Sequence, residues 1–211
     1  LSRFYRVGKE QIFVGVGSDD VLSMCFLTFF NSDKPILFPD ITYSFYKVWA
    51  ELYRIPYECC PLDEKMHLRK EDYCKENGGI IFPNPNAPTG IYESLDVIEE
   101  ILKQNPDVIV IVDEAYIDFV TSVEVPTARA LLDEFPNVFI MRTFSKAYGL
   151  ANYRVGYMMS SAELANYIQT IRLPYNLNTL SQVAAEAAFG DREFLRSTVE
   201  KNAAERALWE Q

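Results

Sequence analysis

The chain has 211 residues and a mass of 24.2 kDa, and 49% of its residues are hydrophobic, which is enough to build one sizeable core. Its formal net charge of -10 repels phosphate backbones, so nucleic acid is excluded as a partner, and any anion must be held by specific local donors. His67 is the single histidine, which excludes most Ser-His-Asp, Cys-His and histidine-rich metal schemes, and we predict no metal site.

The four cysteines form no C-x-x-C pair, and the sequence has neither a signal-peptide pattern nor an apolar run of about 18 residues. We therefore expect a reduced, cytoplasmic protein with buried thiols and no membrane partner. Adjacent Cys59 and Cys60 would point to opposite faces of a strand.

The chain alternates short apolar runs with segments that have helical spacing. A helix over residues 19–30 is expected to follow the Gly15-Val16-Gly17-Ser18 turn, in which Ser18 is a capping residue. After it, strands are expected at 35–38, 55–60, 79–82, 108–112, 138–142 and 154–159, and helices at 42–53, 95–105, 128–135, 162–171, 180–189 and 194–211. This alternation predicts an α/β fold with three layers, α/β/α, around a mostly parallel sheet.

Polar side chains follow several of these strands where each strand ends. They are Asn84, Asn86, Asp113, Glu114, Thr143 and Ser145. Open α/β sheets bind ligands at the edge formed by the carboxyl ends of their strands, so we expect the site there.

Lys146 lies just past one buried strand, after the hydroxyls of Thr143 and Ser145 and before Arg154. An amine nucleophile that forms a Schiff base must be unprotonated, which a cationic and partly desolvated environment favours. A lysine in a loop is more often a solvated surface residue, so this pattern gains its meaning from the other motifs.

The run 108–112 is followed by Asp113-Glu114-Ala115-Tyr116, which places a carboxylate at the end of a buried strand. Such an acid can keep a pyridine nitrogen protonated. The same pattern is typical of the Mg²⁺-binding Walker B strand of nucleotide hydrolases, but that reading requires a G-x-x-x-x-G-K-[ST] loop, which is absent. An acidic helix cap remains the simplest alternative.

Two loops complete the pattern. The turn from Gly15 to Asp19 opens a helix whose backbone amides can bind phosphate, although such turns are common. The loop over 84–90 is rich in Asn and Pro, and Tyr43 in a second loop could stack on a planar ring.

Taken together, these motifs resemble the pyridoxal-phosphate (PLP) enzymes of the aspartate-aminotransferase fold group, and within them the histidinol-phosphate aminotransferases. The resemblance covers nearly the whole chain. It rests on Gly17-Ser18-Asp19-Asp20, Thr42-Tyr43-Ser44-Phe45-Tyr46, residues 84–90, Asp113-Glu114-Ala115-Tyr116, residues 142–150 and Arg172-Leu173-Pro174-Tyr175-Asn176.

The resemblance implies a role for each matching residue. Lys146 would carry PLP as a Schiff base and then move the substrate's Cα proton, Asp113 would pair with the pyridine nitrogen, and Tyr116 would donate to the phenolic oxygen. The remaining expected cofactor contacts are Tyr43 on the ring face, Asn86 at the ring, and Ser18, Asp19, Thr143, Ser145 and Arg154 at the phosphate. Ala87 stands where the family commonly has Asn, so the residue that contacts the ring oxygen is open between Asn84, Asn86 and Tyr116.

The resemblance also implies a domain division and an activity. Residues 1–175 would form the large PLP-binding domain, and 176–211 would lead toward a small C-terminal domain. Because a helical pattern is under way at residue 1 and another stops mid-course at 211, we expect a piece of a longer chain. That longer chain would supply the substrate-carboxylate arginine and, from the neighbouring subunit of a homodimer, a tyrosine.

The activity implied is transamination of L-histidinol phosphate with 2-oxoglutarate, giving imidazole-acetol phosphate and L-glutamate in histidine biosynthesis. Three alternatives remain: a threonine-phosphate decarboxylase, an aromatic amino-acid aminotransferase, and a non-catalytic protein of the same fold.

Overall fold

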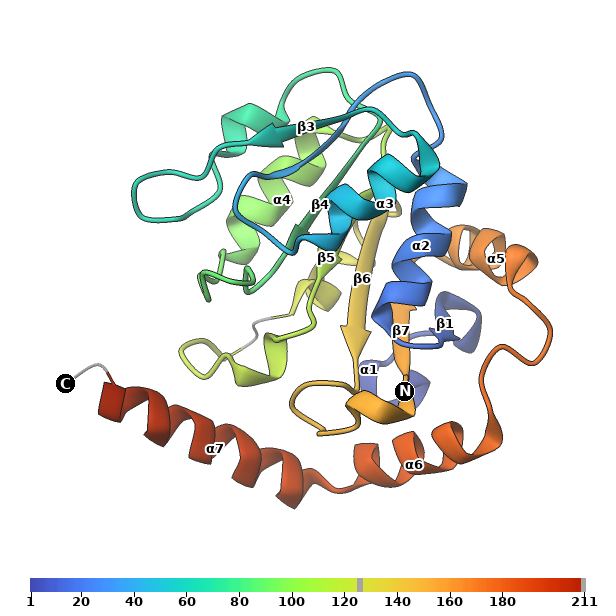
Figure 1. The fold of residues 1–211 in the computed structure, drawn as a ribbon, viewed down its shortest axis with the longest axis vertical. Helices are drawn as coiled ribbons and strands as arrows, with labels where there is room; N and C mark the ends of the chain where they lie inside the picture. Colours follow the sequence, from blue (N-terminus) through green and yellow to red (C-terminus); the bar gives the residue numbers. More distant parts are fainter. Residues whose placement is uncertain (125–126, 210–211) are drawn as a thin grey trace.

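A mixed sheet forms the middle of the structure, with helices on both faces (Figure 1). The computed structural model describes residues 1–124 and 127–209, and within them the sheet has seven strands in the order β1-β7-β6-β5-β4-β2-β3. The strands are β1 (Ile12–Gly15), β2 (Ile36–Pro39), β3 (Tyr57–Cys60), β4 (Gly79–Pro83), β5 (Val110–Asp113), β6 (Val138–Thr143) and β7 (Gly156–Met159).

The helices are α1 (Ser2–Tyr5), α2 (Ser18–Phe29), α3 (Phe45–Tyr53), α4 (Leu95–Gln104), α5 (Ala162–Ile171), α6 (Thr179–Gly190) and α7 (Arg192–Trp209). Helices α2 to α4 lie between strands along the chain, whereas α1 precedes β1, and α5 to α7 follow β7. Short 3-10 turns are η1 (Lys9–Gln11), η2 (Lys70–Tyr73), η3 (Ile117–Phe119), η4 (Ala128–Leu131) and η5 (Ala151–Tyr153). No helix within the two described ranges is both long and apolar enough to cross a membrane.

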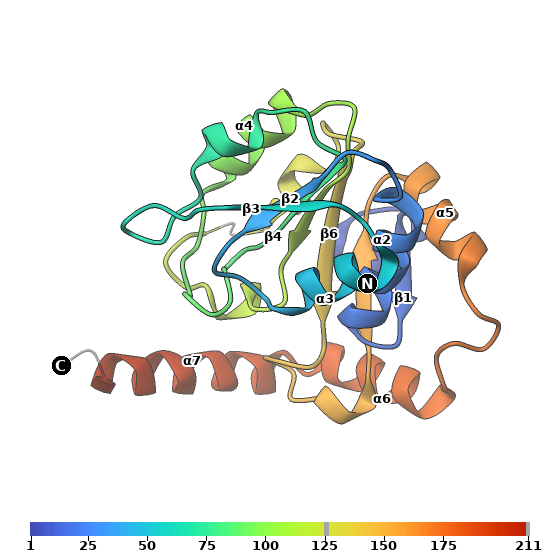
Figure 2. The same cartoon turned by 45° about the horizontal axis from the view of Figure 1, so that its top comes forward.

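The sheet is parallel from β3 to β6, whereas β7 runs antiparallel to both β6 and β1. The carboxyl ends of β1, β2, β4, β5 and β6 therefore meet at one edge, where β7 begins. Helices α6 and α7 run past this side of the sheet, as both views show (Figures 1 and 2).

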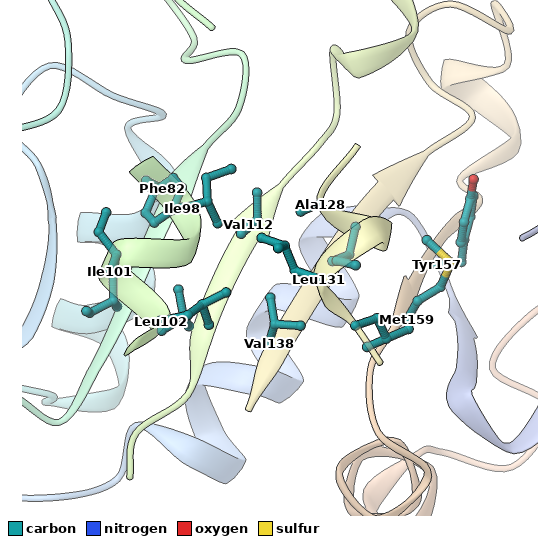
Figure 3. Packing of buried hydrophobic residues seen from close by; sticks show 14 of the residues in the cluster. Phe82, Ile98, Ile101, Leu102, Val112, Ala128, Leu131, Val138, Tyr157 and Met159 are labelled. Atoms are coloured by element: carbon teal, nitrogen blue, oxygen red, sulfur yellow. The ribbon is translucent and has the colours of Figure 1, made fainter. Parts of the chain in front are cut away.

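Two hydrophobic clusters cover the two faces, because successive side chains of a strand point to opposite sides. Val110 and Val112 pack toward α4 and η4 in one cluster, part of which is shown in Figure 3. Ile111 belongs to the other cluster, which contains the buried side chains of α2, α3 and α5. Burial on both faces explains the unbroken apolar runs of the central strands.

The α/β fold with a mostly parallel sheet is confirmed, with four local corrections. Strand β1 was not predicted, and the helix expected at 128–135 is only the 3-10 turn η4. The strand expected to start at residue 154 starts at Gly156, because Arg154 is in the left-handed region (φ 51°). Cys25 and Cys60 are buried as expected, but Cys59 and Cys74 are exposed. The last two residues of the helix expected at 194–211 lie outside the described residues.

Candidate active site

All of the predicted site residues except Asn86 line one cavity of about 160 Å³ at the edge where the strands end. The expected residues in its lining are Ser18, Asp19, Tyr43, Asp113, Tyr116, Thr143, Ser145, Lys146 and Arg154. They come from the last residues of β5 and β6, from the segments that follow β1, β2, β5 and β6, and from the turn before β7. Parallel packing of the central strands therefore explains why residues so far apart in sequence share one cavity.

At one end of the cavity, glycines leave room for an anion to lie close to the backbone. Gly17 has φ 86° and caps α2 without a side chain, and the first two residues of that helix, Ser18 and Asp19, line the cavity. A Cβ on Gly17 would collide with the Arg154 guanidinium, and a Cβ on Gly156 would collide with the Ser18 amide and Gly17. The two glycines thus let a helix N-terminus, a strand and a guanidinium come together around one point.

Arg154 supplies the positive charge at this end. Its Nη2 lies 3.5 Å from Asp19 Oδ2, and its Nη1 donates to the Ala151 carbonyl at 3.1 Å. Asp19 Oδ1 accepts a hydrogen bond from the Tyr43 hydroxyl at 2.9 Å, which fixes the Tyr43 ring at the cavity wall. Because the guanidinium is partly exposed and its ion pair is long, it can still bind an anion in the cavity.

Thr143 and Ser145 bring hydroxyl groups to the same end. Thr143 Oγ1 donates to Ser145 Oγ at 2.9 Å and accepts from the Ser145 amide at 3.1 Å. This local pairing uses the Thr143 proton and leaves the Ser145 proton available to donate to a phosphate oxygen.

Asp113 provides the negative charge deep in the cavity, and only 4% of its surface is exposed. Burial raises the pKa of its carboxyl to about 6, whereas hydrogen bonds from the Tyr46 hydroxyl and the Ala115 amide, and the charge of Lys146, act in the opposite direction. A buried carboxylate held in this way can pair with a cationic ring nitrogen.

Lys146 lines the same cavity as Asp113 and Arg154. Its side chain is exposed, and Nζ lies 5.1 Å from the centre of the Tyr116 ring in a cation-π contact. Both residues line the cavity, so the amine and the phenol hydroxyl belong to the same site.

The amide side chains of the 84–90 loop do not line this cavity. Asn86 donates to the Ile41 carbonyl and to Thr89 Oγ1, and its Oδ1 accepts from Thr42 Oγ1. Asn84 is fully buried and exchanges hydrogen bonds with the Glu93 backbone. Ala87 does line the cavity, and it also lines a neighbouring cavity of about 490 Å³, to which Tyr116 and Asn86 contribute as well.

Sequence reasoning missed one residue that acts at the site. Tyr46 donates to Asp113 Oδ2 at 2.9 Å from a buried position on α3. The sequence predicted a helix over residues 42–53, but nothing in it paired Tyr46 with Asp113. Over residues 1–124 and 127–209, no group of three His, Cys, Asp or Glu side chains could hold a metal ion.

Comparisons with known proteins agree with this geometry. The model of the family "Aminotransferase class I and II" matches residues 1–208. A histidinol-phosphate aminotransferase from Pseudomonas syringae pv. syringae is 46% identical over 204 residues, which are 95% of this chain and 57% of that protein. The chain thus spans a little over half the length of that relative.

Solved structures share the fold at lower sequence identity. Histidinol-phosphate aminotransferase from Sinorhizobium meliloti, solved in complex with pyridoxal-5′-phosphate, superposes with a TM-score of 0.90 at 23% identity, covering 98% of this chain and 57% of that one. L-threonine-O-3-phosphate decarboxylase from Porphyromonas gingivalis has a TM-score of 0.77 at 19% identity, covering 92% and 58%. The fold alone therefore does not separate transamination from decarboxylation.

The family match over nearly the whole chain and the cavity that joins Lys146, Asp113 and Arg154 lead to the same conclusion: this chain belongs to the class I and II aminotransferases, a family of enzymes that use PLP as their cofactor.

Proposed function

We propose that this chain forms the cofactor-binding part of an enzyme that transfers the amino group of L-histidinol phosphate to 2-oxoglutarate, giving imidazole-acetol phosphate and L-glutamate. The observation that carries the proposal is the single cavity in which Lys146, Asp113 and Arg154 meet. The substrate pair is taken from the 46% identical relative, whose name specifies histidinol phosphate.

The donor set of the cavity fits PLP, which is an anion at one end and carries a basic ring nitrogen at the other. The cradle formed by Gly17, Gly156 and the α2 N-terminus, with the hydroxyls of Thr143 and Ser145 and the Arg154 guanidinium, would hold the phosphate. The buried Asp113 carboxylate would accept a hydrogen bond from the protonated ring nitrogen.

When bound, PLP supplies an electron sink that stabilises negative charge at the substrate Cα. Lys146 would hold the cofactor through its ε-amine and, once released by substrate, would take the proton from Cα and return it as a general base and acid. Tyr43 would pack on the ring face, and Tyr116 would donate a hydrogen bond to the phenolic oxygen. Because the amide of Asn86 bonds to Ile41 and Thr42 of a second loop and to Thr89 of its own, and because Ala87 has no donor, Tyr116 is the donor we assign to that oxygen.

The remaining assignments belong to the same proposal. Residues 1–175 would be the large PLP-binding domain, and 176–211, which include α6 and α7, would lead toward a small domain.

A homodimer in the cytoplasm is proposed. Leu173 and Tyr175 are exposed apolar side chains (75% and 99%) in the Arg172–Asn176 motif, and they offer contact surface to a second copy. Sedimentation of the full-length protein tests the dimer.

The activity is tested on the full-length protein with L-histidinol phosphate and 2-oxoglutarate as substrates. We expect formation of L-glutamate without release of CO₂, with ping-pong kinetics. Release of CO₂ from a phosphorylated amino acid without glutamate formation would instead identify a decarboxylase. Transamination of aromatic amino acids in preference to histidinol phosphate would change the substrate assignment, and absence of any reaction would leave a binding protein of this fold.

A further inference from the structure

Tyr46 is a buried polar side chain next to the cavity that the proposed mechanism has not used. It lies in the first turn of α3, and none of its surface is exposed. Its hydroxyl is 67 residues away in sequence from its hydrogen-bond partner, Asp113, so tertiary packing alone brings the two together.

The hydrogen bonds of Asp113 define how its carboxylate is oriented. Oδ2 accepts from the Tyr46 hydroxyl at 2.9 Å, and Oδ1 accepts from the Ala115 amide at 3.1 Å. A carboxylate oxygen has two lone pairs, so each oxygen can accept one further hydrogen bond. With both oxygens held, the carboxylate plane has little freedom to rotate, and the remaining lone pairs face fixed directions.

The ring of Tyr46 touches a second residue of the site. It meets the Tyr43 ring edge-on, with the ring centres 5.6 Å apart and the planes at 82°, and it also packs edge-on against Phe38 at 6.1 Å. Tyr43 is in turn held at its hydroxyl by Asp19. The single side chain of Tyr46 therefore contacts two residues that line the cavity, Asp113 and Tyr43.

We infer that Tyr46 is a positioning residue for the cofactor: it aims the Asp113 carboxylate at the ring nitrogen and holds the Tyr43 ring against the cofactor face. The inference rests on the proposed function, because it requires PLP in this cavity. Tyr46 acts through Asp113 and Tyr43, and it does not line the cavity itself.

The electrostatics of the pair agree with this role. Burial raises the pKa of the Tyr46 hydroxyl well above its usual range, so the hydroxyl keeps its proton and remains a donor. Burial also raises the pKa of Asp113 to about 6, and the hydrogen bond from Tyr46 opposes that rise because it favours the ionised carboxylate. Without the hydroxyl, the carboxylate would lose its charge at a higher pH and would pair less well with a cationic nitrogen.

The test compares two cofactors in two proteins. PLP and 1-deazapyridoxal 5′-phosphate, which has C–H in place of the ring nitrogen, are titrated into the full-length protein and into its Tyr46→Phe variant. Since the variant changes only a hydroxyl, we expect its affinity for PLP to fall about tenfold and its affinity for the deaza analogue to change by under about twofold. The ratio of the two dissociation constants is a property of folded protein, so partial loss of folded yield does not obscure it.

Tyr53→Phe is the matched control, since Tyr53 lies on the same helix and its hydroxyl bonds to Ser23, outside the cavity. It should change neither affinity by more than about twofold. Equal losses for PLP and the deaza analogue in Tyr46→Phe would show a merely structural role and overturn the inference alone. Failure of the unsubstituted protein to bind PLP would overturn the proposed function and this inference together.

Discussion

Arg142 is the centre of a buried charge cluster beneath the site, and its removal should unfold the protein at a much lower temperature. Its guanidinium lies 3.5 Å from Glu114 Oε2 and 2.6 Å from Asp118 Oδ1, and it also covers the Tyr5 ring at 5.5 Å. The Glu114 side chain is completely buried. Substitution Arg142→Met keeps most of the volume but leaves Glu114 without its countercharge.

Breaking a buried ion pair on one side costs about 3–5 kcal/mol. For a domain of this size, each kcal/mol lowers Tm by roughly 2–4 °C, so we expect a decrease of about 6–20 °C in a thermal unfolding scan. A double variant, Arg142→Met with Glu114→Gln, should recover part of that loss because the completely buried Glu114 charge is no longer left uncompensated, although Asp118 still lacks its partner.

The loss of stability caused by Arg142→Met should also depend on pH. Burial raises the pKa of Glu114 to about 7, whereas Arg142 and hydrogen bonds from Ala128 and Thr127 lower it. A carboxyl whose pKa is higher in the folded state stabilises the fold at pH values below its unfolded pKa, and that contribution is lost as pH rises through the folded value. Without Arg142 the folded pKa rises further, so the loss of stability continues to higher pH than in the unsubstituted protein.

The difference in Tm between the two proteins should therefore be larger at about pH 8 than at about pH 5.5. A decrease in Tm of less than about 2 °C, or an equal decrease at both pH values, would refute the buried charge cluster as we describe it.

Three further substitutions test the site. Gly156→Ala should cost about 1–3 kcal/mol in the free energy of unfolding, because its Cβ would collide with the Ser18 amide, whereas Gly190→Ala, which meets nothing within 4 Å, should leave Tm nearly unchanged. Arg154→Gln should weaken PLP binding about tenfold or more by loss of a charge-assisted hydrogen bond, while Arg196→Gln, in an exposed ion pair on α7, should not. Asn86→Ala should lower Tm with a smaller loss of PLP affinity than Arg154→Gln, since the amide of Asn86 ties its loop to residues 41 and 42 and does not line the cofactor cavity.

The sequence predicted the central strands because burial on both faces makes their apolar runs continuous, as in β4, β5 and β6. Strand β1 escaped prediction because it has four residues, of which only Phe13 and Gly15 are buried. The region 128–135 has helical spacing, but only the 3-10 turn η4 forms there, with Thr127 as its cap and the Ala128 amide bonded to Glu114.

The site could be predicted wherever a residue follows a strand, because the sheet itself collects such residues at one edge. Lys146 and Asp113 were predicted in this way, whereas Arg154, in the turn before β7, was predicted from its position eight residues after Lys146. The partners of Asn86 and the pairing of Tyr46 with Asp113 depend on contacts between segments more than 40 residues apart, which no local pattern encodes.

The most direct test of the central claim is borohydride reduction of the PLP-loaded protein, followed by peptide mapping of the labelled lysine. We predict loss of the visible absorbance band and a phosphopyridoxyl group on Lys146 alone. A label on any other lysine, or no label after reduction, would contradict the assignment of Lys146 as the residue that carries the cofactor.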